Sequence, residues 1–277
     1  MKLLTLNTHS LMEENYKEKL KYFIEVLEEK KYDVIALQEV NQSHGDKTVS
    51  LEDLFSLGYV SCEENVLIKE DNHLYNIVKA LREKDCDYFW SWCPIKLGYE
   101  KYDEGIGILT KIKPEHVKTL YITNSHDFYN WKTRKIIGTE VKTEKGFKWF
   151  YSIHMGWWND IEEGFLTQWE KLEKNLDKEK SIYLMGDFNN PAEIEGEGYS
   201  KIICSGWKDS YDLAESKDNG ITVSGLIDGW KDKKGLKQMR IDFIFKNKKE
   251  KVLTSKVIFN GKNKNIISDH FGVEIEE

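Results

Sequence analysis

The sequence predicts an α/β protein in which two β-sheets pack face to face and helices cover their outer sides. Apolar β-type runs and amphipathic helical segments alternate along most of the chain. Several β-type runs also follow one another without a helix between them, which favours two packed sheets. No Pro- or Ser-rich linker and no repeat of about 20 to 50 residues interrupts the pattern, so we expect a single domain, 1–277.

Each element is predicted from the spacing of its apolar residues. An apolar face recurs at helical spacing in four segments, which are expected to be helices at residues 14–30, 72–84, 161–176 and 197–204. Short apolar runs predict β-strands at residues 2–9, 32–40, 105–112, 134–143, 147–155, 181–189, 240–247, 251–260 and 271–277. The stretch between the last helix and about residue 238 is predicted to be irregular.

Composition excludes several classes of protein. The chain has 41 Lys and Arg against 48 Asp and Glu, a formal net charge of −7, so general binding to polyanions is not expected. No segment is long and apolar enough to span a bilayer, and we expect no membrane partner. The 4 cysteines have no short paired spacing, which favours free thiols in a reducing compartment. We therefore predict a cytoplasmic protein.

Polar residues with metal or proton chemistry lie at or near the ends of several predicted strands. One such residue alone is compatible with a turn former, a helix cap or a structural histidine. Together they indicate a site, because apolar strands that converge on polar ends build one. The residues are Asn7, Glu39, His154, Asp187, Asn189, Asp242, Ser268, Asp269 and His270.

Three of these residues carry the hard oxygen atoms that Mg²⁺ and Mn²⁺ prefer and that suit zinc poorly. They are the amide of Asn7 and the carboxylates of Glu39 and Asp269. We therefore expect a Mg²⁺ cofactor, with Mn²⁺ as a substitute, at these three residues. Such an ion keeps several waters and binds a substrate phosphate.

The remaining residues fit the proton chemistry of a hydrolase. Asp187 can accept a proton from an attacking water, and Asn189 can orient the water or a phosphoryl oxygen. Asp242 and His270 are expected to form a carboxylate–imidazole pair, and His154 to be a second donor for phosphoryl charge. This set predicts metal-assisted hydrolysis of a phosphate ester.

The order of the motifs resembles that of the endonuclease/exonuclease/phosphatase superfamily, which includes the DNase I-like enzymes. The motifs are "LN" at Asn7, "LQEV" at Glu39, "SIHMG" at His154, "MGDFN" at Asp187 and Asn189, "RIDFIF" at Asp242 and "SDH" at 268–270. The resemblance implies a four-layer α/β/β/α sandwich with the site at one edge of the sheets. It also implies metal positions at Asn7, Glu39 and Asp269, a water-activating pair at Asp187 and Asn189, and Asp242 as the partner of His270.

A further acid is suggested by the same resemblance. "YDEG" places Glu104 near the start of a strand, where DNase I-like members carry an acid that pairs with the histidine corresponding to His154. A solvated loop acid is the alternative interpretation.

The superfamily cleaves both phosphodiesters and phosphomonoesters, so the substrate must be inferred from other features. The acidic balance disfavours tight nonspecific binding to DNA, although a nucleic acid partner stays open. No signal peptide of the kind that secreted sphingomyelinases carry is present, and the inositol phosphatase signatures are missing. These features favour a small phosphorylated substrate.

Aromatic residues near the predicted site suggest a sugar. Trp157 and Trp158 follow the His154 motif and Trp131 precedes a strand, so we predict that these indoles contact a sugar ring and that Arg134 clamps a phosphate. The alternatives are core packing for the tryptophans and a solvated basic turn for Arg134.

Three segments, "KYDEGIGILT", "YNWKTRKIIG" and "IHMGWWND", are similar to a bacterial branch of maltose 6′-phosphate phosphatases. We therefore expect a Mg²⁺-dependent phosphomonoesterase acting on a phosphorylated sugar. The alternatives are an exonuclease III- or DNase I-like nuclease, a sphingomyelinase-like phosphodiesterase and a non-catalytic relative. The sequence does not indicate an oligomeric state.

Overall fold

A computed structural model describes residues 1–225, 227, 230 and 238–277 of the chain. One sheet contains β1 (Lys2–Asn7), β2 (Val34–Ser43), β3 (Phe89–Gly98), β4 (Tyr102–Thr110), β10 (Ala214–Lys217), β14 (Val252–Ile258) and β15 (Gly272–Glu276). The other contains β5 (His116–Tyr121), β6 (Lys135–Thr143), β7 (Gly146–His154), β8 (Ser181–Asp187), β9 (Lys208–Asp209) and β13 (Asp242–Lys246). A short ribbon is formed by β11 (Val223–Ser224) and β12 (Gln238–Met239).

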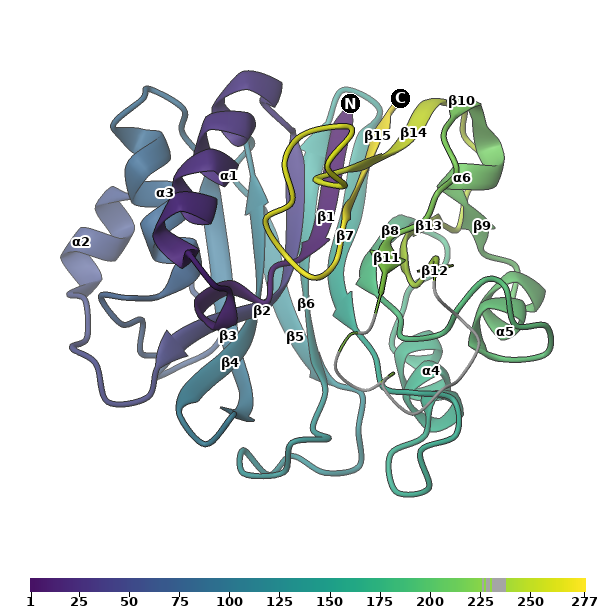
Figure 1. Cartoon of the computed structure of the whole chain (residues 1–277), viewed down its shortest axis with the longest axis horizontal. Helices are drawn as coiled ribbons and strands as arrows, with labels where there is room; N and C mark the ends of the chain where they lie inside the picture. The colour runs from purple at the N-terminus through teal and green to yellow at the C-terminus, as the bar shows by residue number, and fades with distance from the viewer. Residues whose placement is uncertain (226, 228–229, 231–237) are drawn as a thin grey trace.

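Both sheets are mixed. The first has the strand order β10-β14-β15-β1-β2-β4-β3, and the second has the order β5-β6-β7-β8-β13-β9. Most neighbouring strands are antiparallel, but β1 runs parallel to β2, β10 to β14, and β7 to β8. The sheets lie face to face with helices outside them, so the predicted four-layer sandwich is confirmed (Figure 1).

The helices occupy both outer faces of the sandwich (Figure 1). They are α1 (Tyr16–Lys30), α2 (Leu51–Ser56), α3 (His73–Arg82), α4 (Phe165–Lys174), α5 (Gly198–Cys204) and α6 (Ser210–Leu213), and one 3₁₀ turn, η1, spans Ser10–Met12. Helices α1 to α3 cover the first sheet, and α4 and α5 lie beside the second. The Asn72 side chain caps α3 by accepting a hydrogen bond from the Tyr75 amide.

Alternation along the strands produces three apolar layers. Leu4 and Leu6 of β1 pack towards α1 and α3, whereas Leu3 packs between the sheets, because successive strand residues face opposite sides. The layer between the sheets includes Phe150 and Met185. The third layer, between the second sheet and α4, is built on aromatic residues, among them Phe165, Trp169 and Trp207.

The structure corrects some predicted element boundaries. The predicted third helix begins at Phe165, so Ile161 lies outside it and is 99% exposed where an apolar helix face was expected. Strands β3 and β5 and helix α2 were not predicted. The predicted irregular stretch contains α6 and the short strands β9, β10 and β11, and its residues 226, 228–229 and 231–237 lie outside the described part of the chain. In the described part, no helix is long and apolar enough to cross a membrane.

An ionic cluster joins the two sheets near the C-terminus. Lys148 Nζ lies 2.8 Å from Glu250 Oε2, and the Tyr183 hydroxyl lies 2.9 Å from the same oxygen. Lys246 forms ion pairs with Glu250 and Glu277. Burial alone raises the pKa of Glu250, but the hydrogen bonds from Lys148 and Tyr183 outweigh this effect and lower the pKa to about 2.

Glu250 is therefore expected to make stability depend on pH in the acid range. Its pKa of about 2 in the folded protein lies below the ordinary value of 4.5, so its contribution is fully present above pH 4.5 and is lost as the pH falls towards 2. Glu250→Gln should lower the melting temperature by about 2 °C near neutral pH. Thermal unfolding of both proteins at a series of pH values tests this, and a difference that stays constant down to acid pH contradicts it.

Candidate active site

A cavity of about 450 Å³ opens at one edge of the two sheets. The structure brings most of the predicted site residues together, because the cavity is lined by Glu39, Glu104, Trp131, Arg134, His154, Trp157, Asp187, Asn189, Asp269 and His270. Asn7 and Asp242 lie immediately behind this lining and contact Glu39 and His270, respectively. Seven of these side chains are positioned by the ends of β1, β7, β8 and β13, by the irregularity within β2 and by the loop before β15.

Strand register places three chemical groups side by side. Asp187 of β8 pairs with His154 on β7 and with Asp242 on β13. Directly paired residues on neighbouring strands present their side chains on the same face. His154 Nε2 consequently lies 3.6 Å from Asp187 Oδ2 and 3.9 Å from Glu39 Oε1.

Gly186 permits the close approach of β7 and β8 just before Asp187. Its φ is +152°, and a Cβ atom at this position would lie 1.9 Å from the carbonyl oxygen of Ile153. Any larger residue must separate the two strands at the point where His154 and Asp187 meet. The glycine of the "MGDFN" motif is therefore a steric requirement of the site.

His270 and Asp242 form the predicted carboxylate–imidazole pair. His270 Nδ1 lies 3.0 Å from Asp242 Oδ2, and His270 Nε2 lies 3.9 Å from Asp187 Oδ2. Burial alone lowers the pKa of His270, but the charges of Asp242 and Asp187 outweigh it and raise the pKa well above the usual value. The ring is therefore held as an imidazolium that can stabilise negative charge or donate a proton.

Asp187 is a buried carboxylate adjacent to this pair. Burial raises the pKa of Asp187 to about 7, although the His270 charge opposes the shift. The backbone amide of Asn189 donates to Asp187 Oδ1 at 2.8 Å, which fixes the direction of the carboxylate. A carboxyl group whose pKa lies near neutrality is suited to exchange a proton with a water molecule.

Asn189 has an uncommon backbone conformation, and hydrogen bonds hold both ends of its side-chain amide. Its φ is +50°, an uncommon value for a residue other than glycine. Its amide nitrogen donates to the Met155 carbonyl at 2.9 Å, and its amide oxygen accepts from Trp230 Nε1 at 3.2 Å. Sequence reasoning did not assign a role to Trp230, because an indole far along the chain carries no local signal of this contact.

Glu39 lies at an irregularity in β2. The pairing of β2 with β4 shifts between Leu37 and Val40, and Glu39 itself has a φ of +50°. Asn7 Nδ2 donates to Glu39 Oε1 at 2.8 Å and to Asp187 Oδ2 at 3.2 Å. Asn7 thus presents its amide nitrogen to the carboxylates in this structure, whereas the sequence analysis expected its oxygen to face a metal.

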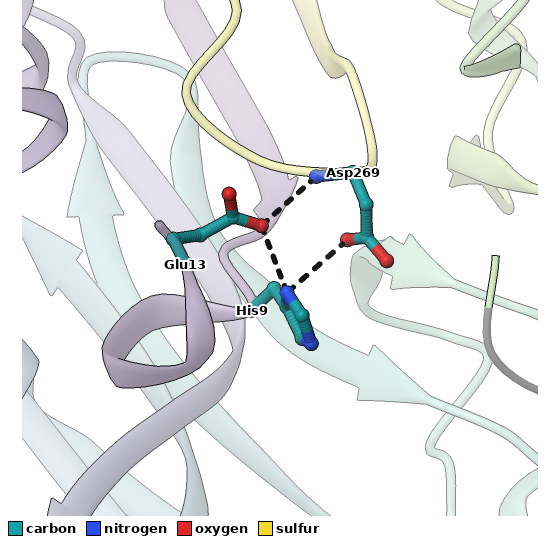
Figure 2. A group of neighbouring side chains, drawn as sticks. All are labelled: His9, Glu13 and Asp269. Carbon is teal, nitrogen blue, oxygen red and sulfur yellow. Dashed lines mark hydrogen bonds and ion pairs between the residues drawn. The ribbon is translucent and has the colours of Figure 1, made fainter. Parts of the chain in front are cut away.

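Asp269 reaches the cavity from the loop before β15. The Ser268 hydroxyl donates to the Asn7 carbonyl at 2.7 Å and ties this loop to the end of β1. Figure 2 shows Asp269 beside His9 and Glu13, which sequence reasoning missed. His9 Nδ1 lies 2.8 Å from Glu13 Oε1 and 3.9 Å from Asp269 Oδ1.

The predicted role of Glu104 as the partner of His154 needs correction. Glu104 Oε1 lies 3.1 Å from Lys96 Nζ, and these two buried residues pair across β3 and β4. In the part of the chain that the structure describes, the carboxylates within 4 Å of His154 belong to Glu39 and Asp187. Lys96, which also lines the cavity, was not predicted, because a lysine in a strand resembles a solvent-facing residue.

The four predicted substrate-binding residues separate into two groups. Trp131, Arg134 and Trp157 line the cavity, and the Trp131 and Trp157 rings lie 6.0 Å apart. Trp158 instead packs against Phe165 beside α4, and it is not among the described residues that line the cavity. The structure therefore does not bring Trp158 to the site.

The acidic residues of the cavity fit a hard cation. Burial raises the pKa of Glu39, and the neighbouring charges of Glu104 and Asp269 raise it further. Carboxylates gathered so that they repel one another are stabilised by a divalent ion between them. The ligand atoms of Asp187, Asp242 and His270 also lie within 4.8 Å of one another, which makes this group a second candidate acidic metal site.

His154 and His270, two of the histidines that line the cavity, face carboxylates, so the groups at this site are suited to activating water. The fold and this chemistry define a hydrolase of phosphate esters. A profile of the Endonuclease/Exonuclease/phosphatase family matches residues 4–270. The chain belongs to this family.

Solved structures show the same relationship. An endonuclease/exonuclease/phosphatase family protein from Leptotrichia buccalis is 36% identical, with a TM-score of 0.86 and coverage of 100% of this chain and 98% of that one. A mannosyl-6-phosphatase from Bacteroides thetaiotaomicron is 15% identical, with a TM-score of 0.63 and coverage of 100% and 98%. A truncated TDP2 from Caenorhabditis elegans is also 15% identical, with a TM-score of 0.59 and coverage of 99% and 95%. No curated protein sequence matches the chain.

Replacing Gly186 tests the steric requirement. Gly186→Ala should lower the free energy of unfolding by about 2 kcal/mol or more and reduce phosphate ester hydrolysis at least about tenfold, because its Cβ cannot coexist with the Ile153 carbonyl. Denaturant unfolding and steady-state kinetics measure the two effects. Gly206→Ala is the control, because Gly206 also has a positive φ, +95°, whereas a Cβ there meets no atom within 4 Å. An unchanged hydrolysis rate in Gly186→Ala contradicts the prediction.

Isosteric changes test the buried acid and base. Asp187→Asn and Asp242→Asn should each reduce hydrolysis about 100-fold or more, because the first removes the proton acceptor and the second the partner of His270. Steady-state kinetics and circular dichroism separate a chemical defect from a folding defect. Turnover near that of the original protein in both variants rules out this assignment.

Proposed function

We propose that this protein is a cytoplasmic, Mg²⁺-dependent phosphomonoesterase that removes phosphate from a phosphorylated sugar, with maltose 6′-phosphate as the representative substrate. The observation that carries the proposal is the bounded cavity of about 450 Å³, in which indole rings lie beside the hydrolytic side chains. Small-molecule sites have volumes of about 300 to 1,000 Å³. A duplex nucleic acid instead requires an extended, positively charged surface.

The aromatic residues support a sugar as the organic part of the substrate. Trp157 is half-buried and lines the cavity, while Trp131 is 56% exposed at its rim. The face of an indole offers the apolar, weakly negative surface on which the C–H face of a sugar packs. The phosphate of such a substrate then lies deeper, among the buried polar residues.

Glu39 and Asp269 are the residues proposed to hold Mg²⁺, which when bound neutralises charge on the phosphoryl oxygens. Asp187 takes a proton from the attacking water, and Asn189 fixes the direction of the Asp187 carboxylate through its backbone amide. His270, charged and supported by Asp242, stabilises the negative charge that develops on the phosphoryl group.

His154 is proposed to contact the same phosphoryl group in its neutral form. Burial lowers the pKa of His154 well below its usual value, and the charges of Arg134 and Lys96 lower it further. A neutral imidazole donates one hydrogen bond without adding a charge to a site that already contains several cations.

The fold neighbours agree with this proposal without deciding it. The neighbour from Bacteroides thetaiotaomicron is named a mannosyl-6-phosphatase, and at 15% identity the likeness concerns the fold alone. The net charge of −7 and the limited volume of the cavity, about 450 Å³, are the features that favour a small substrate over DNA.

A substrate panel tests the proposal. Maltose 6′-phosphate, glucose 6-phosphate, plasmid DNA and sphingomyelin are each incubated with the protein, with Mg²⁺ or with EDTA. We expect phosphate release from the sugar phosphates with Mg²⁺, at least about tenfold faster than cleavage of any diester, and no release with EDTA. Rapid cleavage of DNA or sphingomyelin with inert sugar phosphates overturns the proposal, and sugar phosphate hydrolysis in EDTA overturns the metal requirement.

A further inference from the structure

Two buried basic side chains line the cavity beside the hydrolytic residues. Lys96 is 6% exposed and Arg134 is 3% exposed, and both contribute to the cavity wall. Burying a cation is costly unless an opposite charge compensates it. The position of these two residues therefore requires either an internal partner or a ligand.

Of the two cations, Lys96 has a carboxylate partner among the described residues and Arg134 has none. Lys96 Nζ lies 3.1 Å from Glu104 Oε1. Arg134 forms no ion pair within the described residues, and its Nη1 reaches only the carbonyl oxygens of Trp131, at 3.3 Å, and Thr133, at 3.4 Å. Its Nε is buried and has no hydrogen-bond partner among the described residues. The wall thus has an excess of positive charge.

Trp157 adds another unsatisfied donor to this wall. The Arg134 guanidinium lies over the Trp157 ring, 5.7 Å from its centroid. Trp157 Nε1 is buried and, like Arg134 Nε, has no hydrogen-bond partner in the described part of the chain. Lys, Arg and the indole N–H are donors without acceptor capacity, so this surface is complementary to a ligand that offers only acceptors.

These three donors lie in the same cavity as the side chains proposed to contact the phosphoryl group. Lys96, Arg134 and Trp157 line the same cavity as His154. His154 Nε2 itself lies 3.6 Å from Asp187 and 3.9 Å from Glu39. The imidazole, the two cations and the two hydrolytic carboxylates thus line one cavity, so a phosphoryl group bound there meets both sets of charges.

We propose that Lys96, Arg134 and Trp157 form a binding wall for the terminal oxygens of a phosphomonoester dianion and thereby determine preference for monoesters over diesters. A monoester presents three non-bridging oxygens and two negative charges near neutral pH. A diester presents two such oxygens and one charge, and its second organic group has no acceptor to offer this wall. The inference rests on the proposed monoesterase function and names the residues that determine it.

Glu104 is the positioning residue of this wall. Lys96 and Glu104 are paired across neighbouring strands, and their contact directs the ammonium group along the wall. Removing Lys96 alone would leave the Glu104 carboxylate buried and uncompensated, which destabilises a protein severely. A clean test therefore changes both residues together, because the K96M/E104Q double variant leaves neither buried charge without its partner.

The experiment measures kcat/KM for 4-nitrophenyl phosphate and for bis(4-nitrophenyl) phosphate with Mg²⁺. Relative to the original protein, the K96M/E104Q variant should lose about 10- to 100-fold in the ratio of monoester to diester hydrolysis, the usual effect of removing a hydrogen bond to a charged group. Arg134→Met should lower the same ratio relative to the original protein, and it provides the test if the double variant fails to fold. Lys145→Met, a lysine at the exposed β6–β7 turn, should leave the ratio unchanged.

A second measurement separates binding from folding. Inhibition by inorganic phosphate should weaken about tenfold or more in Arg134→Met, whereas inhibition by dimethyl phosphate should change little. Ratios and inhibition constants that do not move in either variant overturn this inference while leaving the monoesterase function standing. An original protein that hydrolyses only the diester overturns the proposed function, and the inference with it.

Discussion

The register between the parallel strands β7 and β8 is the constraint on which the site depends. It pairs His154 with Asp187, and the antiparallel register of β13 then adds Asp242 to the same row. Only glycine at position 186 lets the two backbones approach this closely. A slip of one residue would turn every one of these side chains to the opposite face of the sheet. The apolar layers on both faces of the second sheet prevent such a slip, so core packing and catalytic geometry are specified together.

The site concentrates features that each oppose stability. Glu39 and Asn189 adopt left-handed backbone conformations. The pKa values of Glu39 and Asp187 are raised by burial and by the negative charges of neighbouring acids. Such features persist only where the surrounding structure over-determines them. Hydrogen bonds from Asn7, from the Asn189 amide and from Trp230 provide that surrounding structure. The arrangement lowers the free energy of unfolding, and it provides groups whose charges are complementary to those of a phosphate ester and a cation.

Sequence reasoning predicted that Glu39, Asp187 and His270 share one site, and the structure brings these three residues to one cavity. Their common signal is a polar residue beside an apolar run: Asp187 ends β8, Glu39 lies at the irregularity within β2, and His270 lies in the loop before β15. Sequence reasoning failed where the position of a side chain depends on a contact between two segments that no shared sequence pattern connects. Lys96 and Trp230 owe their positions to tertiary packing, and the pairing of Glu104 with Lys96 instead of His154 follows from the cross-strand register of β3 and β4. The position of Trp158 similarly depends on the direction of the chain after β7, which brings its ring to Phe165. Periodicity describes which face a residue occupies within one element and does not describe which element that face meets.

The joining of β1 to the loop before β15 has a consequence for how the site assembles. Asn7 and Ser268 lie 261 residues apart in the sequence, yet the Ser268 hydroxyl bonds directly to the Asn7 carbonyl. Any partly folded state in which this loop is undocked lacks the contacts of His270 with Asp242 and Asp187. Completion of the buried cluster is therefore coupled to the closure of the first sheet between β1 and β15, two strands that are distant in the sequence.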